Sequence, residues 1–161
     1  MKRTALALLL LMLAAPVQAR DSLGVFEGWG AFRDAQPLRC YAIAEPARSS
    51  GGKWRPFASI AHWPGEGVRG QVHIRLSREV RSSAKVVLSI DDRRITLVGG
   101  GADAWAANPR ADASIIAALR SGRSMSIASV AATGGGFADT YRLKGAATAV
   151  DAAALGCARG R

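Results

Sequence analysis

The chain has 161 residues, of which 49% are apolar, 6% aromatic and 21% charged. This composition excludes a disordered chain and a collagen-like repeat, and the length favours one folded domain over a two-domain enzyme. Basic residues outnumber acidic ones by 22 to 12, and they are mostly arginines spread along the chain. Such a diffuse positive field favours encounter with polyanions. We expect no nucleic-acid partner, because no base-reading helix or stacking platform is evident.

The first nineteen residues have the pattern of a secretory signal peptide. Lys2 and Arg3 give a positive start, residues 5–15 are apolar, and small residues precede a cut after Ala19. The apolar run is shorter than the ~20 residues needed to cross a bilayer. We therefore expect one mature domain over residues 20–161 with no transmembrane segment, located in the periplasm or outside the cell.

The two cysteines, Cys40 and Cys157, lie near opposite ends of the mature chain. In an oxidising compartment an even pair is most simply a disulfide. The alternative, a catalytic or metal-binding thiol, lacks a CxxC spacing and a nearby histidine. Closing so long a loop would remove about 4 to 5 kcal/mol of unfolded-chain entropy. We predict a structural disulfide that ties the two ends together.

Period-two alternation of apolar and polar residues predicts strands along most of the chain. A two-residue turn at Asp91-Asp92 would place Leu88 opposite Ile95 and Val86 opposite Leu97, all on one face. Short strands separated by Gly, Pro and Asp predict an all-β fold, a single antiparallel β-sandwich or barrel-like domain. The predicted strand segments are 28–33, 39–45, 57–63, 71–76, 85–98 (a hairpin), 124–131 and 137–144.

Two helices are expected to interrupt the strands. Asn108 as N-cap and Pro109 at the first helical position predict a short amphipathic helix near 109–121. The alanine-rich segment 146–157 predicts a C-terminal helix, which would dock on the sheet and aim the Cys157 thiol inward. Its predicted docking stripe consists of Val150, Ala154 and Cys157.

Two short motifs resemble catalytic signatures without their structural context. Residues 65–70 fit GxGxxG, but the strand 71–76 follows where a phosphate-binding helix would have to open. Residues 82–85 fit SxxK, but the companion SDN and KTG elements are absent from the sequence. We interpret both segments as turns and expect no cofactor.

Histidines limit the chemistry further. With only His62 and His73, a three-His zinc site is impossible, and we expect no metal. His73 is predicted to face solvent from its strand. A Ser-His-Asp triad could use His62 with Asp91 or Asp139, but only geometry could support it. A small hydrolase or inhibitor with a cleft near Asp139, Arg142 and His62 is therefore the weakest functional alternative.

Asp139 is placed on the apolar face of its predicted strand. A buried carboxylate needs a partner. It is either a functional acid or ligand contact or, as the simpler interpretation, a group hydrogen-bonded to the turn at 134–136 or paired with an arginine.

The densest basic set gives a second candidate surface, for a polyanion such as lipopolysaccharide or a glycan. This requires the set to form one contiguous face. Its members are Arg75, Arg78, Arg81 and Lys85, and we add Asp139 and Arg142 as candidate interaction residues.

A pattern of residues runs from Trp29 to Cys157 and is densest after Trp105. It consists of residues 29–32 followed by Cys40, Trp105 within 103–106, the segment 119–123, residues 125–127, the run 139–149 and Cys157. This pattern resembles the invasion-associated locus B (IalB) family. The chain departs from many members in lacking an extra mid-chain cysteine pair and in having residues 132–135 where a Ser-x-Arg-Gly-like turn is more usual.

The resemblance implies an exported, β-rich cell-envelope protein of a Gram-negative bacterium, with no catalytic residues established for the family. The family name refers to host-cell invasion by pathogenic members. We therefore predict a non-enzymatic envelope or interaction protein, with a polyanion-binding module as the alternative. The sequence leaves open the partner, the oligomeric state, the membrane it adjoins and any role in invasion.

Overall fold

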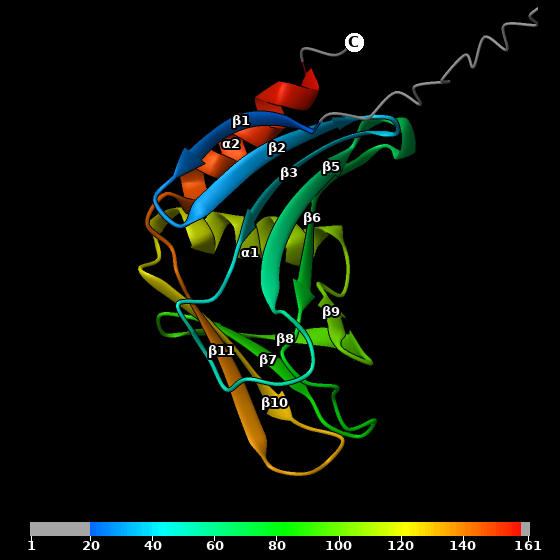
Figure 1. The fold of residues 1–161 in the computed structure, drawn as a ribbon, viewed down its shortest axis with the longest axis vertical. Helices are drawn as coiled ribbons and strands as arrows, with labels where there is room; N and C mark the ends of the chain where they lie inside the picture. Colours follow the sequence, from blue (N-terminus) through cyan, green and yellow to red (C-terminus); the bar gives the residue numbers. More distant parts are fainter. Residues whose placement is uncertain (1–19, 159–161) are drawn as a thin grey trace, which may run out of the picture.

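The computed structural model describes residues 20–158, so the predicted signal peptide lies outside the described residues. The described part contains eleven strands, one 3-10 turn and two α-helices (Figure 1). Their bounds are β1 Asp21–Phe26, β2 Trp29–Ala35, β3 Leu38–Ala44, β4 Arg48–Ser49, β5 Phe57–Trp63, η1 Pro64–Glu66, β6 Val68–Arg75, β7 Val86–Ile90, β8 Arg93–Gly100, β9 Asp103–Trp105, α1 Pro109–Ser121, β10 Ser124–Val130, β11 Gly136–Arg142 and α2 Ala146–Ala158.

The strands form one open antiparallel sheet. Their order is β1-β2-β3-β5-β6-β9-β8-β7-β10-β11-β4, so β1 and β4 are its edges and the sheet does not close into a barrel. β8 pairs with β7 through its first residues and with β9 through its last, and it thereby joins two halves of the sheet. Figure 1 shows these halves as an upper block of β1, β2, β3, β5 and β6 and a lower block around β7, β10 and β11.

The prediction of an antiparallel β fold with two helices is confirmed. The hairpin register is as predicted, with Leu88 opposite Ile95 and Val86 opposite Leu97. Strands β1, β4 and β9 were not predicted, because they are short or irregular; β1 contains a register shift near Gly24. The GxGxxG segment forms η1 and then enters β6, so no helix follows it.

The helices cover one face of the upper block, behind the strands in Figure 1. α2 packs on β1, β2, β3 and β5, and α1 packs on β6. The side chain of Asn108 caps α1 by accepting a hydrogen bond from the Ala111 backbone N–H, 3.0 Å away. Asp112 fixes α1 to the sheet, because its carboxylate accepts the backbone N–H of Val72 at 2.7 Å.

Strand alternation directs small and branched apolar side chains toward the helices. Alanines of β3 and β5 allow α2 to approach the sheet closely, while Trp29 fills the remaining space and donates its indole N–H to the Arg142 carbonyl at 2.9 Å. The helix-side core of the upper block consists of Trp29, Ala31, Ala42, Ala44, Ala58, Ile60, Val72, Ile74 and Ala104.

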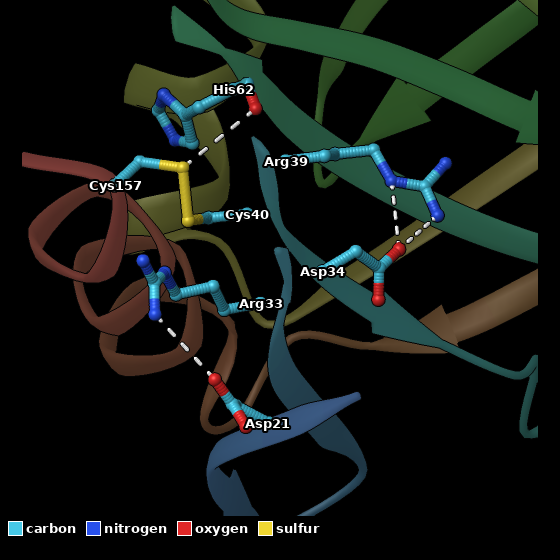
Figure 2. The surroundings of a disulfide bond; sticks show 7 residues. All are labelled: Asp21, Arg33, Asp34, Arg39, Cys40, His62 and Cys157. Atoms are coloured by element: carbon cyan, nitrogen blue, oxygen red, sulfur yellow. Dashed lines mark hydrogen bonds and ion pairs between the residues drawn. A yellow bond between two sulfur atoms is a disulfide. The ribbon is translucent and has the colours of Figure 1, made fainter. Parts of the chain in front are cut away.

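The predicted disulfide is present. Cys40 of β3 and Cys157 of α2 are bonded across 117 residues of sequence, with 5.7 Å between their Cα atoms. Figure 2 shows the bridge beside the backbone carbonyl of His62. It tethers the last turn of α2 to the sheet, as predicted. Val150 and Cys157 of the predicted docking stripe are buried, but Ala153 is buried in place of Ala154.

Candidate functional site

The opposite face of the upper block carries a row of aromatic side chains and is not covered by either helix. We call it the outer face. Because side chains alternate along each strand, the positions between the core residues point to this side. Its aromatic members are Phe32, Tyr41, Phe57, Trp63, His73 and Trp105.

At one end of the outer face, arginines stack on the rings. The Arg39 guanidinium lies between Tyr41 and Trp63, 4.7 Å and 4.9 Å from their ring centroids. Arg20 lies over Tyr41 at 5.6 Å and also contacts Phe32. Stacking of this kind holds a guanidinium in a fixed plane.

Asp34 anchors both arginines. Its carboxylate accepts hydrogen bonds from Nε and Nη2 of Arg39, at 3.2 Å and 2.5 Å, and from Nε of Arg20 at 3.2 Å. Figure 2 shows Asp34 and Arg39 on the other side of the strands from the disulfide. Burial alone would raise the pKa of Asp34, but the hydrogen bonds and charges of Arg39 and Arg20 outweigh it and lower that pKa. The carboxylate therefore stays ionised.

A cavity of about 520 Å³ opens at this end of the sheet. Its walls are Arg20, Asp34, Arg39, Trp63 and the 35–37 turn between β2 and β3. No sequence motif predicts this cavity, since its residues come from three separate segments and only the pairing of β2, β3 and β5 brings them together.

At the other end of the outer face, the His73 ring contacts two other aromatic rings. Its ring is 5.2 Å from Trp105 and nearly parallel to it, while Phe57 meets it edge-on at 5.4 Å. Asp103 lies 2.8 Å from His73 Nε2 and 2.8 Å from Arg75 Nε. His73 does lie on the outer side, as predicted, but its neighbours leave the side chain only 24% exposed. The missed strand β9 supplies two of those neighbours.

The predicted basic residues fall into two groups in the structure, one near Trp54 and one in the segment before β7. Arg75 stacks on Trp54, 5.5 Å from the ring centroid, and Lys53 lies 5.0 Å from the same ring. Arg78 donates to the carbonyls of Gly51 and Ser50, at 2.7 Å and 3.0 Å, and lines a cavity of about 290 Å³ with Lys53 and Trp54.

Arg75 and Arg78 therefore gather around Trp54, together with Lys53, which the sequence analysis did not include. Arg81 and Lys85 are exposed in the segment that leads into β7.

Asp139 is fully buried, as its position in the pattern predicted, but its predicted partners are wrong. Its carboxylate accepts the Ser49 hydroxyl at 2.5 Å and the Ser77 backbone N–H at 2.9 Å, and within residues 20–158 it forms no hydrogen bond or ion pair with the glycine turn or with an arginine. The cause is β4, which pairs with β11 and places Ser49 opposite Asp139. Burial and the charge of Asp139 raise the pKa of Tyr141, so that phenol stays neutral.

The residues of the hydrolase alternative are dispersed. His62 lines a cavity of about 290 Å³ beside the end of α2, while Arg142 lines a different one of about 340 Å³ with Glu27 and Lys144. Burial and the nearby Arg69 lower the pKa of His62. Asp139 lines neither cavity.

Asp91 does not complete a triad. It accepts backbone N–H groups of Arg123 and Ser124 at the end of its hairpin.

Two kinds of feature are absent from residues 20–158. No group of three or more His, Cys, Asp or Glu side chains there could hold a metal ion. No helix in this range is long and apolar enough to cross a membrane.

Comparison with known proteins gives a likeness of fold. No protein-family model matches the chain, and no curated protein matches it in sequence. A crystal structure of invasion associated protein B from Bartonella henselae is similar, with a TM-score of 0.57 and 16% sequence identity, over 83% of this chain and 96% of that one. The chain thus has the fold of that protein.

Proposed function

We propose that the chain is an exported cell-envelope protein of the IalB family, and that it acts by binding through its outer face without catalysing a reaction. The observation that carries the proposal is the outer face itself. Six aromatic rings and three stacked arginines occupy a sheet surface that neither helix covers.

Three independent features support export and family. The N-terminus has a signal-peptide pattern, the disulfide suits an oxidising compartment, and the fold is that of invasion associated protein B. What that protein does in its own organism is not transferred by a likeness of fold at this identity.

The chemistry of the outer face favours recognition. Aromatic rings supply large contact area with few rotatable bonds, and arginines and aromatic residues are enriched among residues that dominate binding energy. Here the arginines are already held by Asp34 and Asp103, so little conformational entropy remains to be lost on binding.

Expression of the full chain in a Gram-negative host tests both the proposed export and the proposed binding. We expect the protein in the periplasmic or extracellular fraction, shortened at its N-terminus, and we expect the purified protein to bind an immobilised envelope fraction. Trp105→Ala should weaken this binding, because it removes an outer-face ring that is 37% exposed.

Leu155→Ala is the matched control, since Leu155 is an exposed apolar residue of α2, 56% accessible, on the helix side of the sheet. Retention of the chain in the cytoplasm, or an equal effect of both substitutions, would contradict the proposal.

A polyanion-binding module is the second candidate, favoured by the group of Lys53, Arg75 and Arg78 around Trp54. It predicts binding to lipopolysaccharide or heparin that weakens steeply with salt and is reduced in Lys53→Ala and Arg78→Ala. Binding that is absent or insensitive to salt would exclude it.

A further inference from the structure

We propose that the cavity between the β2–β3 turn and the end of β5 is a binding site for a carboxylate-bearing sugar, such as a uronic acid unit of an acidic polysaccharide. The inference deepens the proposed function, because the cavity lies at one end of the outer face. It names the class of ligand that this end would take.

The arginines provide a prepared anion site. Arg39 is fixed by two hydrogen bonds to Asp34 and by its stacking on the rings of Tyr41 and Trp63. Arg20 is more open, with 58% of its side chain exposed, and its hydrogen bond to Asp34 uses Nε. Its two terminal nitrogens can therefore donate to a ligand carboxylate in the paired geometry that guanidinium groups favour.

The charge of the cavity selects a monoanion. Two arginines against the single carboxylate of Asp34 leave one positive charge among the lining residues. One ligand carboxylate balances that charge, whereas a doubly charged phosphate would bring excess negative charge next to Asp34. Asp34 is also an acceptor, and sugar hydroxyls are donors that suit it.

Trp63 supplies the remaining element. A pyranose ring has an apolar face of C–H groups, and a half-buried indole at the wall of the cavity can pack against it. The cavity volume of about 520 Å³ falls within the range usual for small-molecule sites. Guanidinium, carboxylate and indole together match the acid, hydroxyl and C–H surfaces of an acidic sugar.

A structural role is the competing explanation, in which the arginines only hold the β2–β3 hairpin through Asp34. Partly exposed ion pairs of this kind contribute little to the stability of a protein. Loss of Arg20 should then leave folding almost unchanged and affect no ligand. The two explanations therefore predict different effects of Arg20→Ala on ligand binding and the same small effect on stability.

Titration calorimetry of the exported, purified protein with trigalacturonate tests the site, with neutral galactotriose as the matched sugar. We expect saturable binding of the acid, and we expect the neutral sugar to bind at least roughly tenfold more weakly. Arg20→Ala and Trp63→Ala should each weaken binding of the acid by roughly tenfold. Arg39→Lys keeps the charge and should also weaken it, because lysine cannot form the planar stacked pair.

Arg55→Ala is the control, because Arg55 is an arginine 90% exposed that pairs with Glu45 away from the cavity. Its binding should equal that of the unaltered protein. Absence of saturable binding, equal affinity for the neutral sugar, or the same loss in Arg55→Ala would overturn the inference.

The test separates this inference from the proposed function. If the envelope fraction binds in a Trp105-dependent manner while trigalacturonate does not bind, the sugar site is wrong and the binding role stands. If trigalacturonate binds at the cavity but the envelope fraction does not bind, the site stands and the envelope role is wrong.

Discussion

The two faces of the upper block are built from the same strands and differ in almost every chemical respect. The helix-covered face has alanine, valine and isoleucine around Trp29, all with little or no exposure. The outer face has aromatic rings on which arginines stack, and these arginines pair with Asp34 and Asp103. Strand alternation alone separates the two sets.

The difference indicates a division of work between stability and recognition. Residues of the covered face lose contact with water on folding, and their removal leaves a cavity in a packed core. Apart from Tyr41, which is 6% exposed, the aromatic residues of the outer face keep part of their solvent contact, so they contribute less to stability and remain accessible to a partner. The following substitutions test that division, from the largest expected effect to the smallest.

The disulfide should have the largest effect. Replacing Cys40 and Cys157 together by alanine releases a loop of 117 residues and should lower the free energy of unfolding by about 4 kcal/mol. Urea unfolding of the double variant measures this. A loss below about 1 kcal/mol would show that the unfolded chain is not appreciably constrained by the bond.

Tryptophans on the two faces should respond unequally. Trp29→Ala removes a fully buried indole and its hydrogen bond to Arg142, and we expect a loss of about 3 to 4 kcal/mol. Trp105→Ala on the outer face should cost about 1 kcal/mol or less, since the ring is 37% exposed. Equal losses in thermal or urea unfolding would contradict the division between the faces.

The buried carboxylate of the lower block should have an intermediate effect. Asp139→Asn replaces an oxygen acceptor by an NH₂ group among the Ser49 hydroxyl and the Ser77 N–H, and should cost about 2 kcal/mol. Asp151→Asn is the control at an exposed ion pair with Arg120, with an expected cost of about 0.5 kcal/mol. Equal costs for the two substitutions would contradict the larger stabilising role assigned to the buried Asp139 network.

The smallest effect concerns pH. Because the folded protein lowers the pKa of His62, the unfolded chain takes up the proton first as pH falls. The contribution of His62 is therefore complete above the ordinary histidine pKa of about 6.5 and is lost as the pH falls below it. His62→Gln should reduce the slope of stability against pH between about 5 and 7. An unchanged slope would exclude His62 as its source.

Much of the fold could be predicted from local pattern. The β7–β8 hairpin and the capped helix α1 depend on residues close in sequence, the Cys40–Cys157 bond that holds α2 follows from there being two cysteines, and all three are confirmed. The strands β1, β4 and β9 could not be predicted, because they are short or irregular and are defined by their pairing partners.

The site was less accessible to prediction for the same reason. The partners of Asp139 and His73 come from β4 and β9, and the arginine cavity joins Arg20, Asp34 and Trp63 from three segments. An alternation of aromatic residues opposite small apolar ones in residues 28–45 and 57–63 was a signal that could have pointed to a two-sided sheet.

Footprinting of tryptophan oxidation in the presence of the envelope fraction tests the central claim most directly, because the four tryptophans sample different surroundings. Binding through the outer face predicts that Trp63 and Trp105 become protected, while exposed Leu155 of α2, read by hydroxyl-radical labelling in the same sample, keeps its reactivity. Protection of Leu155 with unchanged reactivity at Trp63 and Trp105 would contradict the account.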